Sequence, residues 1–128
     1  MSIKIIVRYP DGMLLKGTTA DFFPNKSKFH LIELNGSKSH EIEIANIKAV
    51  YFVKSFEGKK GYAKKMDGVR VGMGRKIKVH FKDGETLIGY TQTYSPSRDI
   101  FIVFPADAES NNEKVVVVTK ATDNVEFL

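Results

Sequence analysis

Short runs of apolar, β-branched residues recur along the chain, and polar or turn-forming residues separate them. In residues 3–9 and 76–81 apolar and polar positions partly alternate, as is typical of strands with one buried face. Each of these two runs ends at an Asp-Gly pair, which favours a tight hairpin turn. No segment carries the periodicity of an amphipathic helix. The pattern therefore predicts an all-β protein.

The second half of the chain repeats the first. A shift of 72 positions aligns residues 4–32 with 76–104 without a gap, and ten of the 29 pairs are identical. Conservative pairs such as Lys26/Arg98 add to these identities. After the aligned stretch, the second half is three residues longer than the first, within "PADAESNNE". A repeat of this kind indicates one structural unit used twice, so we expect an internal duplication. The identical pairs are Lys4/Lys76, Ile5/Ile77, Val7/Val79, Asp11/Asp83, Gly12/Gly84, Leu15/Leu87, Gly17/Gly89, Thr19/Thr91, Pro24/Pro96 and Phe29/Phe101.

Each unit contains five short predicted strands. Five bent antiparallel strands in about 50 residues fit a small closed barrel. A unit of that size buries little core, so we expect the two copies to pack together or to assemble further. The predicted strands lie at 3–9, around Gly17, and at 29–34, 40–44 and 47–53, and then at 76–81, around Gly89, and at 100–104, 114–118 and 125–128.

Six residues are assigned structural roles in turns and corners. In each Asp-Gly pair the glycine can take the left-handed conformation of a hairpin loop. A glycine in the middle of the following strand weakens it unless the strand must bend sharply. The turn residues are Asp11, Gly12, Asp83 and Gly84, and the corner residues are Gly17 and Gly89.

The motif of an apolar strand, Asp-Gly, a leucine at 15 or 87 and a glycine at 17 or 89 resembles the Sm-like family and, more broadly, SH3-like barrels. This resemblance implies two Sm-like barrels. The loops "FPNKSK" and "SPSRD" lack the family's Asp-x-x-Met-Asn pattern, and "IANIK" and "KATDN" lack its second RNA-contacting motif. The family's RNA-contacting residues are therefore not carried over. The whole chain also resembles an uncharacterised bacterial domain of unknown function.

The expected organisation is a first barrel at 1–54, a basic glycine-rich connecting segment at 55–74, and a second barrel at 75–128. The net charge of the protein is +5, and it is concentrated in the middle. From Lys54 to Lys78 there are nine basic residues and two acidic ones, a net charge of +7.

The basic middle has two open interpretations: a solvated linker, or a site for an anionic ligand. Lysines interleaved with aromatic residues can neutralise phosphates while a ring stacks on a base. The candidate ligand-binding residues are Phe56, Lys59, Lys60, Tyr62, Lys64, Lys65, Arg70 and Arg75.

Several kinds of chemistry have little support. The absence of cysteine excludes disulfides and thiol catalysis. His30, His40 and His80 lack the spacing of metal ligands, and no nucleophile lies near a base in the sequence. We therefore expect no metal, no cofactor, no catalytic residue and no enzymatic activity.

The partner and location follow as expectations. No apolar run reaches the length of a membrane span and the N-terminal run is too short for a signal peptide, so we expect a cytoplasmic protein without membrane insertion. The apolar runs 50–53 and 115–118 need pairing, within the chain or between chains. The acidic loop 104–115 is a long hairpin turn or the receptor for another molecule's basic middle.

The leading expectation is a non-enzymatic binding or adaptor module that contacts a protein partner, or itself, through barrel edges. The alternatives are single-stranded nucleic-acid binding and a structural oligomer.

Overall fold

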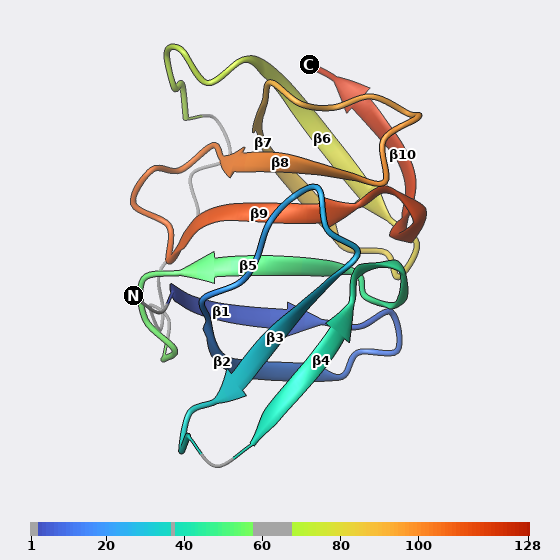
Figure 1. Ribbon diagram of the computed structural model, residues 1–128. Helices are drawn as coiled ribbons and strands as arrows, with labels where there is room; N and C mark the ends of the chain where they lie inside the picture. Colours follow the sequence, from blue (N-terminus) through green and yellow to red (C-terminus); the bar gives the residue numbers. More distant parts are fainter. Residues whose placement is uncertain (1–2, 37, 58–67) are drawn as a thin grey trace.

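A computed structural model of the chain describes residues 3–36, 38–57 and 68–128 (Figure 1). It contains ten antiparallel strands and two single 3₁₀ turns, η1 and η2, so the predicted all-β class is confirmed. The elements are β1 (Ile3–Arg8), β2 (Leu14–Thr19), β3 (Lys28–Glu33), β4 (Ser39–Glu43), η1 (Ile44–Asn46), β5 (Ala49–Val53), β6 (Arg75–Phe81), β7 (Thr86–Thr91), β8 (Ile100–Pro105), β9 (Asn112–Val118), η2 (Thr119–Ala121) and β10 (Thr122–Phe127).

The strands form one sheet in the order β10-β6-β7-β8-β9-β5-β1-β2-β3-β4. Within it the first half has the order β5-β1-β2-β3-β4, and the second half has the equivalent order β10-β6-β7-β8-β9. The halves meet at β5 and β9, which run side by side through the centre of the molecule (Figure 1). The last strand of one half therefore pairs with the fourth strand of the other.

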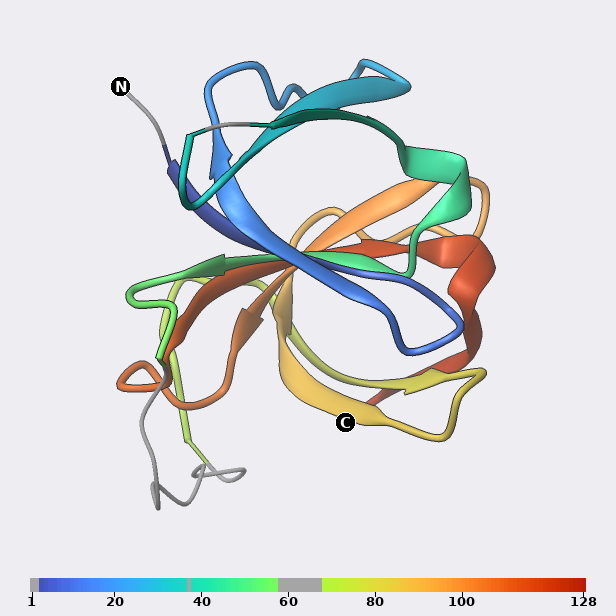
Figure 2. The ribbon, with the colours of Figure 1, turned by 90° about the horizontal axis from the view of Figure 1, so that it is seen from below.

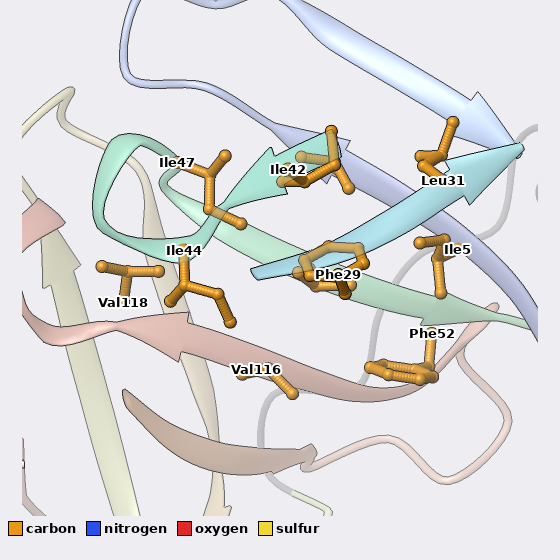
Figure 3. Packing of buried hydrophobic residues seen from close by; sticks show 11 residues of the cluster. Ile5, Phe29, Leu31, Ile42, Ile44, Ile47, Phe52, Val116 and Val118 are labelled. Atoms are coloured by element: carbon orange, nitrogen blue, oxygen red, sulfur yellow. The ribbon is translucent and has the colours of Figure 1, made fainter. Parts of the chain in front are cut away.

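Two hydrophobic cores lie on opposite faces of the central strands. Successive side chains of a strand point to opposite faces, so β9 contributes Val116 and Val118 to one core, and Val115 and Val117 to the other. Figure 3 shows Val116 and Val118 packed with residues of the first half. In Figure 2, β3 and β4 curl over one face of the central strands, and β6 and β7 curl over the other. Each core thus contains residues from both halves.

The two apolar runs that required partners pair with each other. Val50 lies opposite Val116 and Tyr51 opposite Val115, and all five residues of β5 are buried. Burying a side chain of this size stabilises the fold by roughly 1.5–3 kcal/mol. The open edges of the sheet are β4 and β10, whose sequences "SHEIE" and "TDNVEF" are polar and acidic. Charged side chains protect such edges against strand addition.

The turn and corner glycines take two different conformations. Gly12 and Gly84 follow the turn aspartates with φ of +93° and +94°, the left-handed region that glycine favours. At Gly17 and Gly89 the backbone of the next strand passes close by. A Cβ at Gly17 would lie 2.2 Å from the carbonyl oxygen of Ile32, and one at Gly89 would lie 2.3 Å from that of Phe104. A side chain at either position would displace β3 or β8.

A buried lysine ties the two halves together beside the β5–β9 pair. Lys48, only 4% exposed, precedes β5, and its Nζ lies 2.7 Å from Asp83 Oδ2 and contacts Glu85 Oε1, both in the β6–β7 turn of the other half. The same Nζ lies 4.5 Å from the centroid of the Phe81 ring. The pKa of Asp83 lies below its usual value because Lys48 donates a hydrogen bond to its carboxylate. Burial raises the pKa of Tyr51, whose hydroxyl lies 3.5 Å from Glu85. We call Lys48, Tyr51, Phe81, Asp83 and Glu85 together the Lys48 cluster.

Removing both carboxylates of the Lys48 cluster leaves a buried cation without a counter-ion. We expect the Asp83→Asn/Glu85→Gln variant to lower the free energy of unfolding by about 3 kcal/mol, measured by urea denaturation. Asn retains the oxygen that accepts the backbone N–H of Glu85, so the turn is preserved. The matched control is Asp11→Asn in the equivalent exposed turn, with an expected change under about 0.5 kcal/mol. Equal effects of the two variants would contradict a stabilising role for the Lys48 cluster.

The same cluster predicts a pH dependence of stability. Because the folded-state pKa of Asp83 is lowered, its contribution is present above the unfolded-state pKa of about 3.9 and is lost as the pH falls through the folded-state value. The difference in unfolding free energy between the wild type and Asp83→Asn/Glu85→Gln should therefore shrink from neutral pH towards about pH 2. Urea titrations at several pH values measure this difference. A difference that stays constant with pH would exclude the ion pair as its source.

Candidate binding site

A groove runs along the face of β8 and β9 that the first half covers only in part. Its floor consists of two pairs of opposed residues, Ile100 with Val118 and Ile102 with Val116. Val116 and Val118 are buried in the first core, whereas Ile100 and Ile102 are only partly buried against it. The β2–β3 loop crosses in front of β5 and β9 towards β8 and covers part of this face (Figure 1). We call the remaining depression the interloop groove.

The walls of the interloop groove are equivalent loops from the two halves. In the β2–β3 loop the Lys26 N–H donates to the Phe23 carbonyl, and in the β7–β8 loop the Arg98 N–H donates to the Ser95 carbonyl, both at 3.0 Å. Proline follows the first residue of each turn, the position where its fixed φ favours a β-turn. Each turn thus ends in a cation.

Each loop is also fixed to the 3₁₀ turn of its own half. The Ile44 N–H donates to the Ser27 carbonyl, and the Thr119 N–H donates to the Asp99 carbonyl, each at 2.9 Å. Residues 24–27, 44–45, 96–100 and 118–120 together line a cavity of about 550 Å³. We call it the basic cavity, because Lys26, Arg98 and Lys120 all line it.

A second, apolar cavity adjoins the first. It has a volume of about 250 Å³ and is lined by aromatic and aliphatic residues, with Lys114 at its wall. Phe22 packs edge-on against Phe52, at 5.5 Å between ring centroids, while Phe23 is 48% exposed. A third cavity shares Pro24 and Ile102 with the aromatic cavity, and it shares Arg98 and Ile100 with the basic cavity. The cavities therefore form one groove. The groove therefore has an aromatic end and a basic centre.

Among the described residues the cations of the basic cavity have no acidic partner, and the Lys26 Nζ lies 5.1 Å from the centroid of the Phe23 ring. Within residues 3–36, 38–57 and 68–128, no carboxylate lies within 4.0 Å of the charged groups of Lys26, Arg98 or Lys120. Asp99 is the one acidic residue in the described part of the lining. The Thr119 hydroxyl, in the same lining, is the one buried side-chain oxygen without a hydrogen-bond partner in the described chain. An anionic group is thus favoured over a cationic one at this site.

The basic middle is described only in part. Lys59, Lys60, Tyr62, Lys64 and Lys65 lie outside the described residues. The other three candidates make contacts within the chain: Phe56 packs against the second core, Arg70 donates to the Pro105 carbonyl at 3.1 Å, and the guanidinium of Arg75 lies 4.0 Å from the centroid of the Phe127 ring. Each of these three side chains therefore has a partner within the chain, and their role in ligand binding stays a prediction.

The acidic loop between β8 and β9 contacts its own chain. The Lys54 Nζ donates to the Ala108 carbonyl at 3.0 Å, and Asn111 exchanges hydrogen bonds with Ser55. Asp107 and Ser110 are buried. The loop therefore packs against the residues that follow β5, which agrees with the interpretation of a long hairpin turn.

The three histidines interact with three different carboxylates. His30 and His40 lie on the paired strands β3 and β4, and His80 lies on β6. Each faces a different carboxylate: His30 faces Asp21 at 2.6 Å, His40 faces Glu33 at 2.9 Å and His80 faces Glu126 at 3.1 Å. The pKa of Asp21 is lowered because it accepts hydrogen bonds from the His30 backbone and ring. Among the described residues, no group of three or more acidic or histidine side chains has the arrangement of a metal site.

Sequence reasoning did not select Lys26, Arg98 and Lys120 as site residues. One signal was present, since Lys26 and Arg98 occupy the same position of the repeat, each two residues after a proline. Lys120 had no such signal, because its equivalent in the first half is Ala45. The convergence of these residues depends on how the halves pair, which the sequence pattern leaves open.

The fold and the groove define an all-β protein with a basic surface depression between two similarly ordered halves. The chain belongs to a family of unknown function, DUF6982, whose match covers residues 1–128. No curated protein and no solved structure matches the chain. Among the described residues, no helix has the length and apolar character required to cross a membrane.

Proposed function

We propose that this protein is a non-enzymatic binding or adaptor module whose ligand occupies the interloop groove. The observation that carries this proposal is the convergence of Lys26 and Arg98, from equivalent turns of the two halves, on one cavity of about 550 Å³. That volume lies within the range of ligand sites in proteins. A cavity with three cations, one carboxylate and an aliphatic floor suits a ligand with both anionic and apolar parts.

We further propose that the two halves are Sm-like or SH3-like barrels that arose by duplication. Their equivalent strand orders, their equivalent loop hydrogen bonds and the ten identical pairs support this origin. On this proposal the groove is the product of duplication, because it requires one loop from each copy. The cytoplasmic location expected from the sequence stays a prediction.

Single-stranded nucleic acid on the basic middle is the competing proposal, supported by the net charge of +7 between Lys54 and Lys78. It predicts that a labelled RNA oligonucleotide binds with a steep loss of affinity between about 50 and 200 mM salt. Simultaneous substitution of Lys59, Lys60, Lys64 and Lys65 by alanine should then abolish binding, whereas Arg98→Glu should leave it unchanged.

Phenyl phosphate, which joins a ring to an anionic group, is a small probe for the interloop groove. We expect its addition to shift the backbone amide resonances of Ile100, Ile102 and Thr119 in two-dimensional NMR spectra of the full chain. Arg98→Glu should weaken this binding at least about tenfold, because it replaces an attractive charge with a repulsive one. Lys38→Glu is the matched control, at the far end of β3, and should bind the probe as the wild type does. Resonance shifts that cluster elsewhere on the protein would contradict the proposed site.

A further inference from the structure

The floor of the interloop groove sets the spacing between its apolar and its charged parts. Ile102 and Val116 lie under the aromatic cavity, and Ile100 and Val118 lie under the basic cavity. The two pairs are two residues apart along each strand, so they are separated by roughly 7 Å. Lys120 lies in η2, the 3₁₀ turn that follows Val118, and lines the same basic cavity.

The aromatic cavity has the size and lining of a pocket for one large apolar side chain. It is about 250 Å³ in volume, and the rings of Phe22, Phe23 and Phe52 line it. The exposure of Phe23, at 48%, leaves apolar surface in contact with water in the free protein. A partner side chain that covers this surface gains the free energy of apolar burial.

The basic cavity favours carboxylates that lie next to such an anchor. Arg98 presents a planar guanidinium that binds carboxylates through two parallel hydrogen bonds, and Lys26 and Lys120 add point charges. Lys114, whose Nζ lies 4.7 Å from the centroid of the Phe52 ring, places a further cation at the aromatic end. Acidic residues are thus favoured on both sides of the apolar anchor.

The lining of the basic cavity argues for a peptide over a single-stranded nucleic acid. Nucleic acids bind such grooves by stacking successive bases on aromatic side chains. Residues 24–27, 44–45, 96–100 and 118–120 include no aromatic residue, so the described lining of the basic cavity offers no ring on which a base could stack. An extended peptide advances about 3.3 Å per residue, so the 7 Å offset corresponds to about two residues.

We propose that the interloop groove binds an extended acidic segment of a partner protein, with one large apolar side chain in the aromatic cavity and acidic residues two to four positions away in the basic cavity. This proposal rests on the proposed function and names the class of partner for the same site. It assigns Phe23 and Ile102 to the anchor, and Lys26, Arg98 and Lys120 to the acidic residues.

The test is fluorescence anisotropy with a labelled peptide of about ten residues, in which one phenylalanine is followed two to four positions later by glutamates and glycine and serine fill the rest. We expect saturable binding to the full-length protein that weakens with salt. The Lys26→Glu/Arg98→Glu variant should weaken it at least about tenfold. Lys38→Glu should bind as the wild type does, and replacing the peptide phenylalanine by serine should also weaken binding at least about tenfold.

Urea denaturation shows whether the groove variant is folded, and replacement of the peptide phenylalanine tests the anchor without any change to the protein. The proposal is overturned if the peptide does not bind, if it binds wild type and groove variant equally, or if a labelled RNA oligonucleotide binds in the groove and displaces it. If phenyl phosphate still maps to the groove while the peptide fails, only the class of partner is wrong. If both fail, the proposed site is wrong as well.

Discussion

The antiparallel pairing of β5 with β9 joins the two halves, and the shared cores, the Lys48 cluster and the interloop groove all depend on it. In this pair Ala49 to Tyr51 lie opposite Val117 to Val115, all buried. The pairing removes two apolar edges from solvent in one step. It also shares the side chains of β9 between two cores, since alternate residues face opposite sides of the sheet. Neither core is complete without residues from the other half.

The position of the Lys48 cluster follows from the same pairing. Lys48 precedes β5, so the joining of the halves brings it against the β6–β7 turn, where two carboxylates face it. The corresponding residue of the second half is Asp123, on the open edge of the sheet. The open edges β4 and β10 therefore have no equivalent of the apolar contacts and ion pairs that join the two halves at β5 and β9. Their acidic side chains would repel one another in a head-to-tail contact between two copies.

The interloop groove is a further consequence of the junction. The first half buries Val116 and Val118 of β9 but covers β8 only in part, which leaves Ile100 and Ile102 at the bottom of a depression. The equivalent turns then stand on either side of it with their cations directed by the same local geometry. A ligand in this groove would contact both halves at once, so its binding would stabilise the junction by mass action.

Local sequence patterns predicted the strands well, because alternation, Asp-Gly turns and mid-strand glycines act over a few residues. The strand predicted at 47–53 is observed at Ala49–Val53, and the one at 114–118 lies within Asn112–Val118. The burial of Lys48 had no signal, because lysine is mostly exposed and its partners are more than 30 residues away.

The candidate site was harder to predict for the same reason. The basic middle is a continuous charge run that is visible in the sequence. The basic cavity instead collects four short segments from both halves, which the β5–β9 pairing brings together. A sequence pattern of two similar units leaves open which edges meet. It therefore leaves open which loops become neighbours.

Native-state hydrogen exchange tests most directly whether the shared strands make the two halves one cooperative unit. Amide exchange would be followed by NMR at increasing urea concentrations, still below the unfolding transition. Our prediction is that backbone amides of Ala49–Val53 and Val115–Val118 exchange only through global unfolding, with the same opening free energy as the inner strands β1 and β6. Exchange of the β5–β9 amides at a lower free energy, with either half remaining protected, would contradict it.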